Sequence, residues 1–142
     1  MIIVDTGVFV AWADSGDKYH DAAVSVIRNA KVVGEQLALT PMVLAECCYL
    51  INEAGGAVSE AAFIEDVADG VFTLLSLDNH DLIRIADLVR KFAGFPLGGS
   101  DASSAVAADR YGTKKIATFD RRHFPALSPE SGGHFDLLPS TL

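Results

Sequence analysis

The sequence predicts an α/β domain with a mainly parallel central sheet, and two features of its pattern carry this prediction. Short apolar runs alternate with longer stretches in which apolar residues recur at the spacing of an amphipathic helix. Strands that alternate with helices favour a parallel sheet, because each helix returns the chain to the start of the next strand. At 142 residues, without repeats or a dividing linker, we expect one domain spanning residues 1–142.

The elements in the first half follow from apolar runs and from helix-capping residues. Thr40 followed by Pro41 is an N-cap with proline at the first helical position, an arrangement that starts helices well. The paired glycines at 55–56 should end that helix, and Ser59 should cap the next. In order, we expect a strand at 2–4, helices at about 7–13 and 19–30, a strand at 37–39, and helices from 41 to the paired glycines and from 59 to about 70.

The second half continues the alternation. Asp78 or Asn79 should cap a long amphipathic helix that Gly94 closes. Ser100 can cap the following helix, and Gly112 stands where a C-terminal glycine is expected. In order, we expect a strand at 72–77, helices at 79–93 and 101–111, a strand at 116–118, a tight turn or single helical turn at 120–123, and an edge strand at 135–138.

The composition excludes several classes of protein. Half of the residues are hydrophobic, but no apolar stretch approaches the roughly 18–20 residues of a membrane span. The start of the chain shows no cationic region followed by an apolar stretch and a cleavage site. Cys47 and Cys48 are adjacent within a helical pattern, which is no disulfide framework. We therefore expect a cytoplasmic protein with no membrane partner.

The charge is negative overall but unevenly distributed. A net charge of −8 taken alone argues against a nucleic-acid-binding protein, since phosphate binding usually needs a basic surface. Five of the eleven Lys and Arg residues, however, lie within one short segment, which predicts either a local basic strip that could bind RNA or simply a solvated helix end and loop. These residues are Arg110, Lys114, Lys115, Arg121 and Arg122.

Four acidic residues stand out by their positions in the predicted elements. Asp5 directly follows the first strand, and Asp120 follows the strand at 116–118. Asp101 falls in the first turn of a helix, and Glu46 in the second turn of the helix that begins at Pro41. Functional groups of an open parallel sheet gather beyond the carboxyl ends of its strands, so one fold could bring all four to the same edge.

Each acid has a structural alternative when taken singly. Asp101 could serve only to stabilise the positive end of a helix, and Asp120 could serve only as a turn former. Glu46 could lie on the exposed stripe of an amphipathic helix. Asp5 has the weakest alternative, because a carboxylate between two apolar runs must reach solvent, a partner or a cation.

Taken together, the acids predict a divalent cation site. Two carboxylates ~6 Å apart at an effective dielectric constant of ~20 repel by on the order of 3 kcal/mol, so a shared cleft needs protonation or a cation. Mg²⁺ and Mn²⁺ prefer oxygen ligands and could align a water for attack on a phosphodiester. Hydroxyl groups beside three of the acids could support such a site or only cap helices and turns; they belong to Thr6, Ser100 and Thr118.

Four segments in this order and spacing closely resemble the PIN domain, and more narrowly the VapC ribonuclease toxins of bacterial toxin–antitoxin pairs. The segments are VDTGVFVAW, PMVLAECCYL, GGSDASSAVAADRYG and IATFDRRHF, and the resemblance covers residues 1 to about 138. It implies a three-layer α/β/α fold and a Mg²⁺- or Mn²⁺-dependent endoribonuclease. It also implies a homodimer and a small antitoxin of VapB type whose C-terminal tail wraps the toxin.

The acidic site of the family maps onto the four acids singled out above. The resemblance implies that Asp5, Glu46, Asp101 and Asp120 are the catalytic and metal-binding residues. The last segment departs from the pattern: relatives often have Thr-Asn-Asp, whereas this chain has phenylalanine at 119, whose side chain cannot hydrogen-bond in the site. Gly98-Gly99 before Ser100 predicts either a flexible or a close-fitting approach to Asp101.

Two other functions remain open. A haloacid-dehalogenase-like phosphatase also has an aspartate after its first strand, but it needs a second acid two residues later, where this chain has Gly7. A non-catalytic module could use the same acids only to bind a basic partner peptide. Added Mn²⁺ distinguishes this module from a nuclease, because only a nuclease gains cleavage activity.

Overall fold

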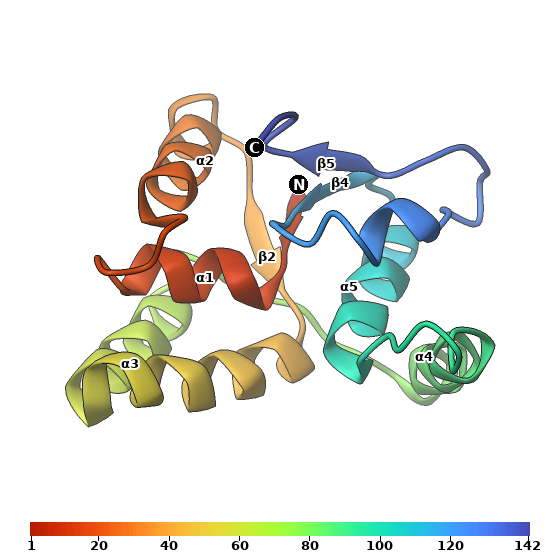
Figure 1. The fold of residues 1–142 in the computed structure, drawn as a ribbon, viewed down its shortest axis with the longest axis horizontal. Coiled ribbons are helices and arrows are strands. Elements are labelled where there is room, and N and C mark those ends of the chain that lie inside the picture. The colour runs from red at the N-terminus through yellow and green to blue at the C-terminus, as the bar shows by residue number, and fades with distance from the viewer.

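The computed structural model describes residues 1–142 and is built around a five-stranded, wholly parallel sheet (Figure 1). The strands are β1 (Ile2–Val4), β2 (Leu37–Leu39), β3 (Thr73–Leu74), β4 (Lys115–Ala117) and β5 (Asp136–Leu138). They lie in the order β3-β2-β1-β4-β5, so β1 is the central strand. The predicted α/β class with a mainly parallel sheet is confirmed.

Five α-helices cover the two faces of the sheet. They are α1 (Thr6–Ala13), α2 (His20–Val32), α3 (Pro41–Ala68), α4 (Asn79–Lys91) and α5 (Gly99–Arg110), and a 3-10 helix spans Phe124–Ala126. Figure 1 shows α1, α2 and α3 on one side of the sheet and α4 and α5 on the other. No helix combines the length and apolar character that a membrane crossing requires.

Alternating residues of β1 build the two hydrophobic cores. Ile2 and Val4 pack in a cluster with residues of α1, α2 and α3, while Ile3 packs in a second cluster with residues of α4 and α5. All three side chains are buried, because successive strand residues point to opposite faces and both faces are covered. The short apolar run at the start of the sequence therefore becomes the most enclosed strand of the sheet.

The structure corrects the predicted end of α4, which stops at Lys91 with Phe92 as its C-cap and is not closed by Gly94, and it corrects two predicted helix starts. Residues 41–68 consist of two helical segments that meet at a kink at Gly56, as the paired glycines predicted, but the second segment begins directly after Gly56, so Ser59 lies within it instead of capping it. The N-cap of α5 is Gly98, so Ser100 is in the first helical turn and does not cap. In both cases glycine sets the backbone path: Gly56 has φ 76° and ψ −173°, a conformation essentially restricted to glycine.

The strand predicted at 72–77 is shorter in the structure, where β3 contains only Thr73 and Leu74. Phe72 is instead buried against the rings of Phe9 and Phe63. The chain leaves the sheet at Ser76, whose backbone N–H and carbonyl both hydrogen-bond the hydroxyl of Tyr111. Aromatic packing and this side-chain contact therefore end the strand before its apolar run ends.

Substituting Gly56 with alanine tests the kink. We expect Gly56→Ala to lower the free energy of unfolding by about 1–2 kcal/mol, because a Cβ atom strains this backbone conformation. Gly7 is the matched control, since it lies in helix α1 with open space around its Cα, and Gly7→Ala should leave stability unchanged or raise it by up to about 1 kcal/mol. Urea unfolding measures both; equal effects would contradict a special role for Gly56.

Candidate functional site

Asp5 lies at the carboxyl end of the central strand, at the N-cap position of α1. Its backbone N–H donates to the carbonyl of Ala117 at 2.9 Å, which fixes the strand end against β4. Its side chain is 5% exposed, and Oδ2 accepts a hydrogen bond from the hydroxyl of Thr118 at 2.9 Å. The other oxygen, Oδ1, is buried and has no protein partner. Such an oxygen is a strong candidate for an external ligand, because buried polar atoms are rarely left unpaired.

The electrostatics place two further acids close to Asp5. The pKa of the Asp5 carboxyl is raised to about 7, first by burial and then by the negative charges of Asp101 and Glu46. The pKa of Asp101 is also raised, first by burial and then by the charges of Asp120 and Glu46. The fold therefore brings Asp5, Glu46 and Asp101 within electrostatic range of one another, and Asp120 within range of Asp101.

The four acids differ in their access to solvent. Asp5 is buried, Asp101 and Asp120 are half-buried, and Glu46 is exposed. Ser100 of α5 donates a hydrogen bond to Oε2 of Glu46 in α3 at 3.2 Å, so its hydroxyl links the two helices at this edge. The acids thus extend from the end of β1 toward solvent.

Glycine at position 99 allows helix α5 to approach helix α3 at the site. A Cβ atom on Gly99 would lie 2.9 Å from Cε of Met42, the far end of a flexible side chain, so a larger residue at position 99 would require Met42 to shift. Gly99 is the first residue of α5, and Asp101 follows in the same turn. Of the two alternatives predicted for this segment, the close-fitting one is therefore found at Gly99.

Asp120 is held by its own turn. Its Oδ1 accepts hydrogen bonds from the backbone N–H groups of Arg122 and His123, both at 2.8 Å, and Oδ2 lies 2.8 Å from Nδ1 of His123. Burial alone would raise the pKa of Asp120, but these hydrogen bonds and the charge of His123 lower it overall. The pKa values of Asp5 and Asp120 are thus shifted in opposite directions by their surroundings.

The remaining predicted supporting residues take different places. The Thr118 hydroxyl bridges two acids, since it donates to Asp5 and accepts from the backbone N–H of Asp120 at 3.0 Å. Thr6 is buried, and its hydroxyl has no hydrogen-bond partner. Phe119 stacks on Tyr19 with ring centroids 4.7 Å apart, so the residue that replaces the polar one of the pattern packs against the hydrophobic core.

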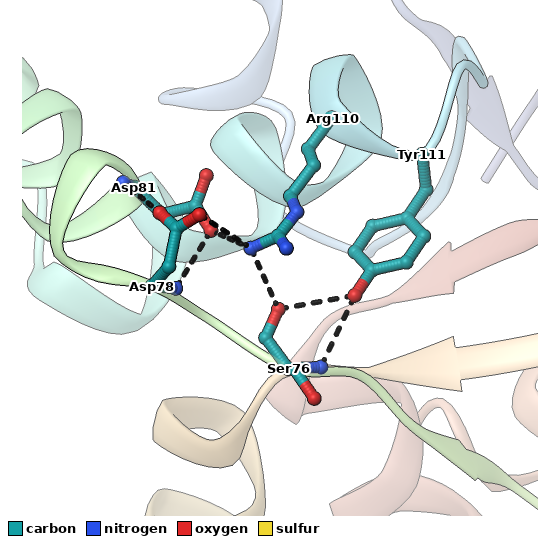
Figure 2. A network of polar contacts seen from close by, with 5 residues as sticks. All are labelled: Ser76, Asp78, Asp81, Arg110 and Tyr111. Atoms are coloured by element: carbon teal, nitrogen blue, oxygen red, sulfur yellow. Dashed lines mark hydrogen bonds and ion pairs between the residues drawn. The ribbon is translucent and has the colours of Figure 1, made fainter.

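Three of the five predicted RNA-binding residues lie away from the acids. Arg110 ends α5, at the opposite end from Asp101, and is paired with Asp78 and Asp81, with its guanidinium also donating to the Ser76 carbonyl at 3.3 Å (Figure 2). Lys115 begins β4 and is paired with Glu35. The ammonium group of Lys114 donates to the Gly132 carbonyl at 3.0 Å.

The other two basic residues follow β4 at the acidic edge. Arg121 donates from Nη2 to the Pro139 carbonyl, while its Nε is buried without a partner. Arg122 is exposed, and its guanidinium lies over the ring of Phe95, with 5.0 Å between Cζ and the ring centroid. The structure therefore does not join the five cations into one strip and brings only this pair to the acids.

Sequence reasoning missed the contact between His123 and Asp120. His123 is three residues after Asp120 in a turn, and at this spacing a side chain can reach back to a carboxylate. This spacing could have indicated the contact from the sequence. It also missed Asp81, which is buried and forms a reciprocal capping box with Asp78 at the start of α4. Asp81 pairs with Arg110 at the C-terminal end of α5 and is no part of the acidic site.

The acidic edge fits a divalent cation by the chemistry of its donors. All four acids offer carboxylate oxygens, the ligands that Mg²⁺ and Mn²⁺ prefer. Oδ1 of Asp5 is buried and unpaired, and the mutual repulsion that raises the pKa values of Asp5 and Asp101 is what a cation would relieve. The side chains do not form a preassembled cage of three or more ligands, so a cation would have to draw them together.

Comparison with known proteins gives a family match and a close relative. The PIN domain model matches residues 2–128. The chain is 34% identical over 138 residues to Ribonuclease VapC26 of Mycobacterium tuberculosis. This alignment covers 97% of the chain and 100% of that relative.

Solved structures share the fold at lower sequence identity. VapC20 of Mycobacterium tuberculosis, a sarcin–ricin-loop cleaving toxin, superposes with a TM-score of 0.75 at 19% identity, covering 85% of this chain and 91% of that one. VapBC2 of Rickettsia felis, bound to promoter DNA, superposes with a TM-score of 0.64 at 14% identity, covering 89% of this chain and 93% of that one. FitAcB of Neisseria gonorrhoeae superposes with a TM-score of 0.61 at 17% identity, covering 86% of this chain and 89% of that one.

The sequence and fold comparisons agree with the resemblance carried by the four segments. The family match spans most of the chain, and the 34% identical relative is matched over its whole length. The chain therefore belongs to the PIN-domain family and is of the VapC type.

Proposed function

We propose that this protein is the toxin of a toxin–antitoxin pair and acts as a Mg²⁺- or Mn²⁺-dependent endoribonuclease. The observation that carries the proposal is the buried Asp5 carboxylate, which has one unpaired oxygen and lies within electrostatic range of Asp101 and Glu46. The naming of the 34% identical relative as a ribonuclease supports the activity. The VapC20 neighbour, a sarcin–ricin-loop cleaving toxin, supports the toxin role.

Asp5, Asp101, Glu46 and Asp120 would hold the cation, which when bound supplies an activated water and stabilises charge on the phosphodiester. Thr118 orients Asp5 by donating to Oδ2, which leaves Oδ1 free for a ligand. Ser100 orients Glu46 from the opposite helix. The hydrogen bonds that lower the pKa of Asp120 keep this carboxylate ionised at neutral pH, so it can keep a negative charge beside Asp101.

The proposed partners are an RNA substrate, a small VapB-type antitoxin and a second copy of the chain. The VapBC2 neighbour supports the antitoxin. Large exposed apolar side chains offer surface that a protein partner could cover; the most exposed are Val32, Val33, Tyr49, Val58 and Ile83. Both cysteines are free thiols, which supports the proposal that the chain acts in the reducing cytoplasm.

The second candidate function is a non-catalytic module that uses its acidic edge to bind a basic peptide. Glu46 is exposed and Asp101 is half-buried, so a cationic side chain of a partner could reach them and relieve their repulsion, which favours this second function. A nuclease and a peptide-binding module respond differently to Mn²⁺, because only a nuclease gains cleavage activity.

Asp101→Asn should reduce Mn²⁺-dependent cleavage of total RNA by at least about 100-fold, because an amide cannot replace the anionic ligand. Asp87→Asn is the matched control, since Asp87 is an exposed aspartate on α4 paired only with Arg90, and it should keep full activity. Gel analysis of the RNA with and without Mn²⁺ measures both. If the unmutated chain binds Mn²⁺ but never cleaves RNA, the non-catalytic function replaces the nuclease.

Asp5→Asn should change how stability depends on pH when divalent cations are removed. The folded chain keeps a proton on Asp5 up to about pH 7, whereas the unfolded chain releases it near pH 3.8, so ionisation of Asp5 lowers folded stability as pH rises between these values. The slope reaches at most about 1.4 kcal/mol per pH unit.

Comparison of the two proteins isolates this effect from other ionisable groups. At pH 4 and below, the unmutated chain and Asp5→Asn should be about equally stable, and by pH 7 the variant should be the more stable. Urea unfolding in EDTA at several pH values gives the two curves. Parallel curves, or a variant much less stable throughout, would mean that Asp5 is a structural residue.

The assembly proposal is tested on the purified chain. Light scattering should give a mass of about twice the 15.1 kDa of one chain, since the exposed apolar side chains favour a dimer. Co-expression with a short protein encoded next to this chain should yield a stable complex with reduced cleavage activity. A monomer that binds no such protein would remove both partners from the proposal.

A further inference from the structure

Three planar side chains meet beside Asp120. Phe95 and His123 have ring centroids 4.7 Å apart at an interplanar angle of 41°, and the guanidinium of Arg122 lies over the same Phe95 ring at 5.0 Å. Phe95 belongs to the segment between α4 and α5, whereas Arg122 and His123 follow β4. We call Phe95, Arg122 and His123 the stacking cluster.

The stacking cluster contains one cation, Arg122, whose side chain is neither paired with a carboxylate nor hydrogen-bonded to a carbonyl. Arg122 is exposed and its side chain makes no hydrogen bond or ion pair, in contrast to Arg110, Lys115, Lys114 and Arg121. The chain contains a second arginine–aromatic pair, Arg110 over Tyr111 at 5.5 Å, but there the arginine is paired with Asp78 and Asp81 (Figure 2). Of the two pairs, only the one beside the acids leaves its positive charge available.

The cluster is attached to the acidic edge from two sides. Nδ1 of His123 lies 2.8 Å from Oδ2 of Asp120, so the imidazole connects the cluster directly to one acid. The segment that contains Phe95 runs into α5, whose first turn contains Asp101. Phe95 and His123 are both half-buried, which restrains their rings while leaving part of each accessible. A ligand on the cluster would therefore lie next to any phosphate bound at the acids.

The overall charge of the chain favours a contact of this kind for RNA binding. With a net charge of −8 and three of the five clustered cations at the far edge, diffuse attraction of phosphates cannot supply most of the affinity. Stacking of a nucleobase on an aromatic ring or a guanidinium does not depend on net charge and tolerates any base. The cluster offers both kinds of surface at one place.

We infer that the stacking cluster is a nucleobase-binding subsite, in which the base of a nucleotide next to the cleaved phosphodiester stacks on the Phe95–Arg122 pair while His123 holds the pair beside Asp120. This inference rests on the proposed ribonuclease function and names a determinant of substrate binding for it. It assigns to Phe95 a role in binding the base and to Arg122 a role that includes its charge.

The test compares two RNA probes that differ only in their bases. One is a fluorescein-labelled oligoadenylate of about 12 nucleotides, and the other is an oligomer of the same length with an abasic site at every second position. Both carry the same phosphates. Dissociation constants are measured by fluorescence anisotropy with Mg²⁺ at several salt concentrations, in the Asp101→Asn background, for which we expect cleavage to be strongly reduced.

Phe95→Leu should weaken binding of the oligoadenylate by about 5- to 100-fold, the range for loss of one stacked base, and change binding of the abasic probe less than twofold. Its salt dependence should stay the same, because no charge is removed. Phe95→Tyr should restore binding of the oligoadenylate. Arg122→Gln should weaken binding of both probes and reduce the slope against log salt by about 0.7, as for one lost phosphate contact.

Two control variants remove similar groups elsewhere. Arg28→Gln removes an exposed arginine of α2 that has no ion pair, and Tyr111→Leu removes the aromatic residue of the neutralised pair. Both should bind the two probes as the parent does, and thermal unfolding confirms that each variant is folded. Equal losses for Phe95→Leu and Tyr111→Leu would reduce the effect to stability and overturn the subsite.

The outcomes separate the subsite from the proposed function. If the unmutated chain cleaves RNA but Phe95→Leu binds both probes like the parent, the subsite is wrong and the nuclease stands. An equal loss of affinity for both probes in Phe95→Leu also overturns it, since the loss would not depend on the base. If the unmutated chain neither cleaves RNA nor binds either probe, the proposed function itself fails.

Discussion

A buried carboxylate at the end of the central strand is the constraint on which the acidic edge of this protein depends. Asp5 is 5% exposed, yet only one of its two oxygens has a protein partner. Burial and neighbouring acids disfavour its ionised form, which is why its pKa is raised to about 7. Burial of such a group is costly unless its surroundings or its function require it, and the cation that we propose for the acidic edge would meet this requirement.

The rigidity of β1 makes this arrangement possible. The strand is buried on both faces and paired with β2 and β4, so its end cannot move to relieve the repulsion between acids. Thr118, at the end of the neighbouring strand, holds one oxygen of Asp5 and the backbone of Asp120. The two acids that follow adjacent parallel strands are therefore positioned by the same hydroxyl group, which links the sheet directly to the site.

The charges of the chain are separated between the two edges of the sheet. At the edge where the strands begin, Lys115 is paired with Glu35, and Arg110, at the end of α5, is paired with Asp78 and Asp81. These contacts neutralise the cations within the protein. At the carboxyl edge the acids repel one another, and Arg122 keeps its charge over Phe95. The cations at 110 and 115 are thus neutralised within the protein, whereas Oδ1 of Asp5 and the guanidinium of Arg122 have no hydrogen-bonding partner in the protein and favour an external ligand.

The sequence by itself determined the α/β class, the order of the strands along the chain and the four acids, because apolar periodicity and the residues after strands are local signals. Those signals placed Asp5 after a buried strand and Asp101 in a first helical turn, and both positions hold in the structure. Local signals also misplaced features: Ser100 looked like a cap, but the N-cap of α5 is Gly98.

Only the tertiary structure decided which charged groups are available. Five cations within 13 positions of sequence (110–122) look like one strip. Strand β4, however, runs between the cations that precede it and the two that follow it, so these two groups lie at opposite ends of the strand. The partners of Arg110 and Lys115 lie 29 and 80 residues away in the chain, so no local pattern could reveal them. The same holds for Phe95, whose contact with Arg122 exists only because α5 returns the chain to the start of β4.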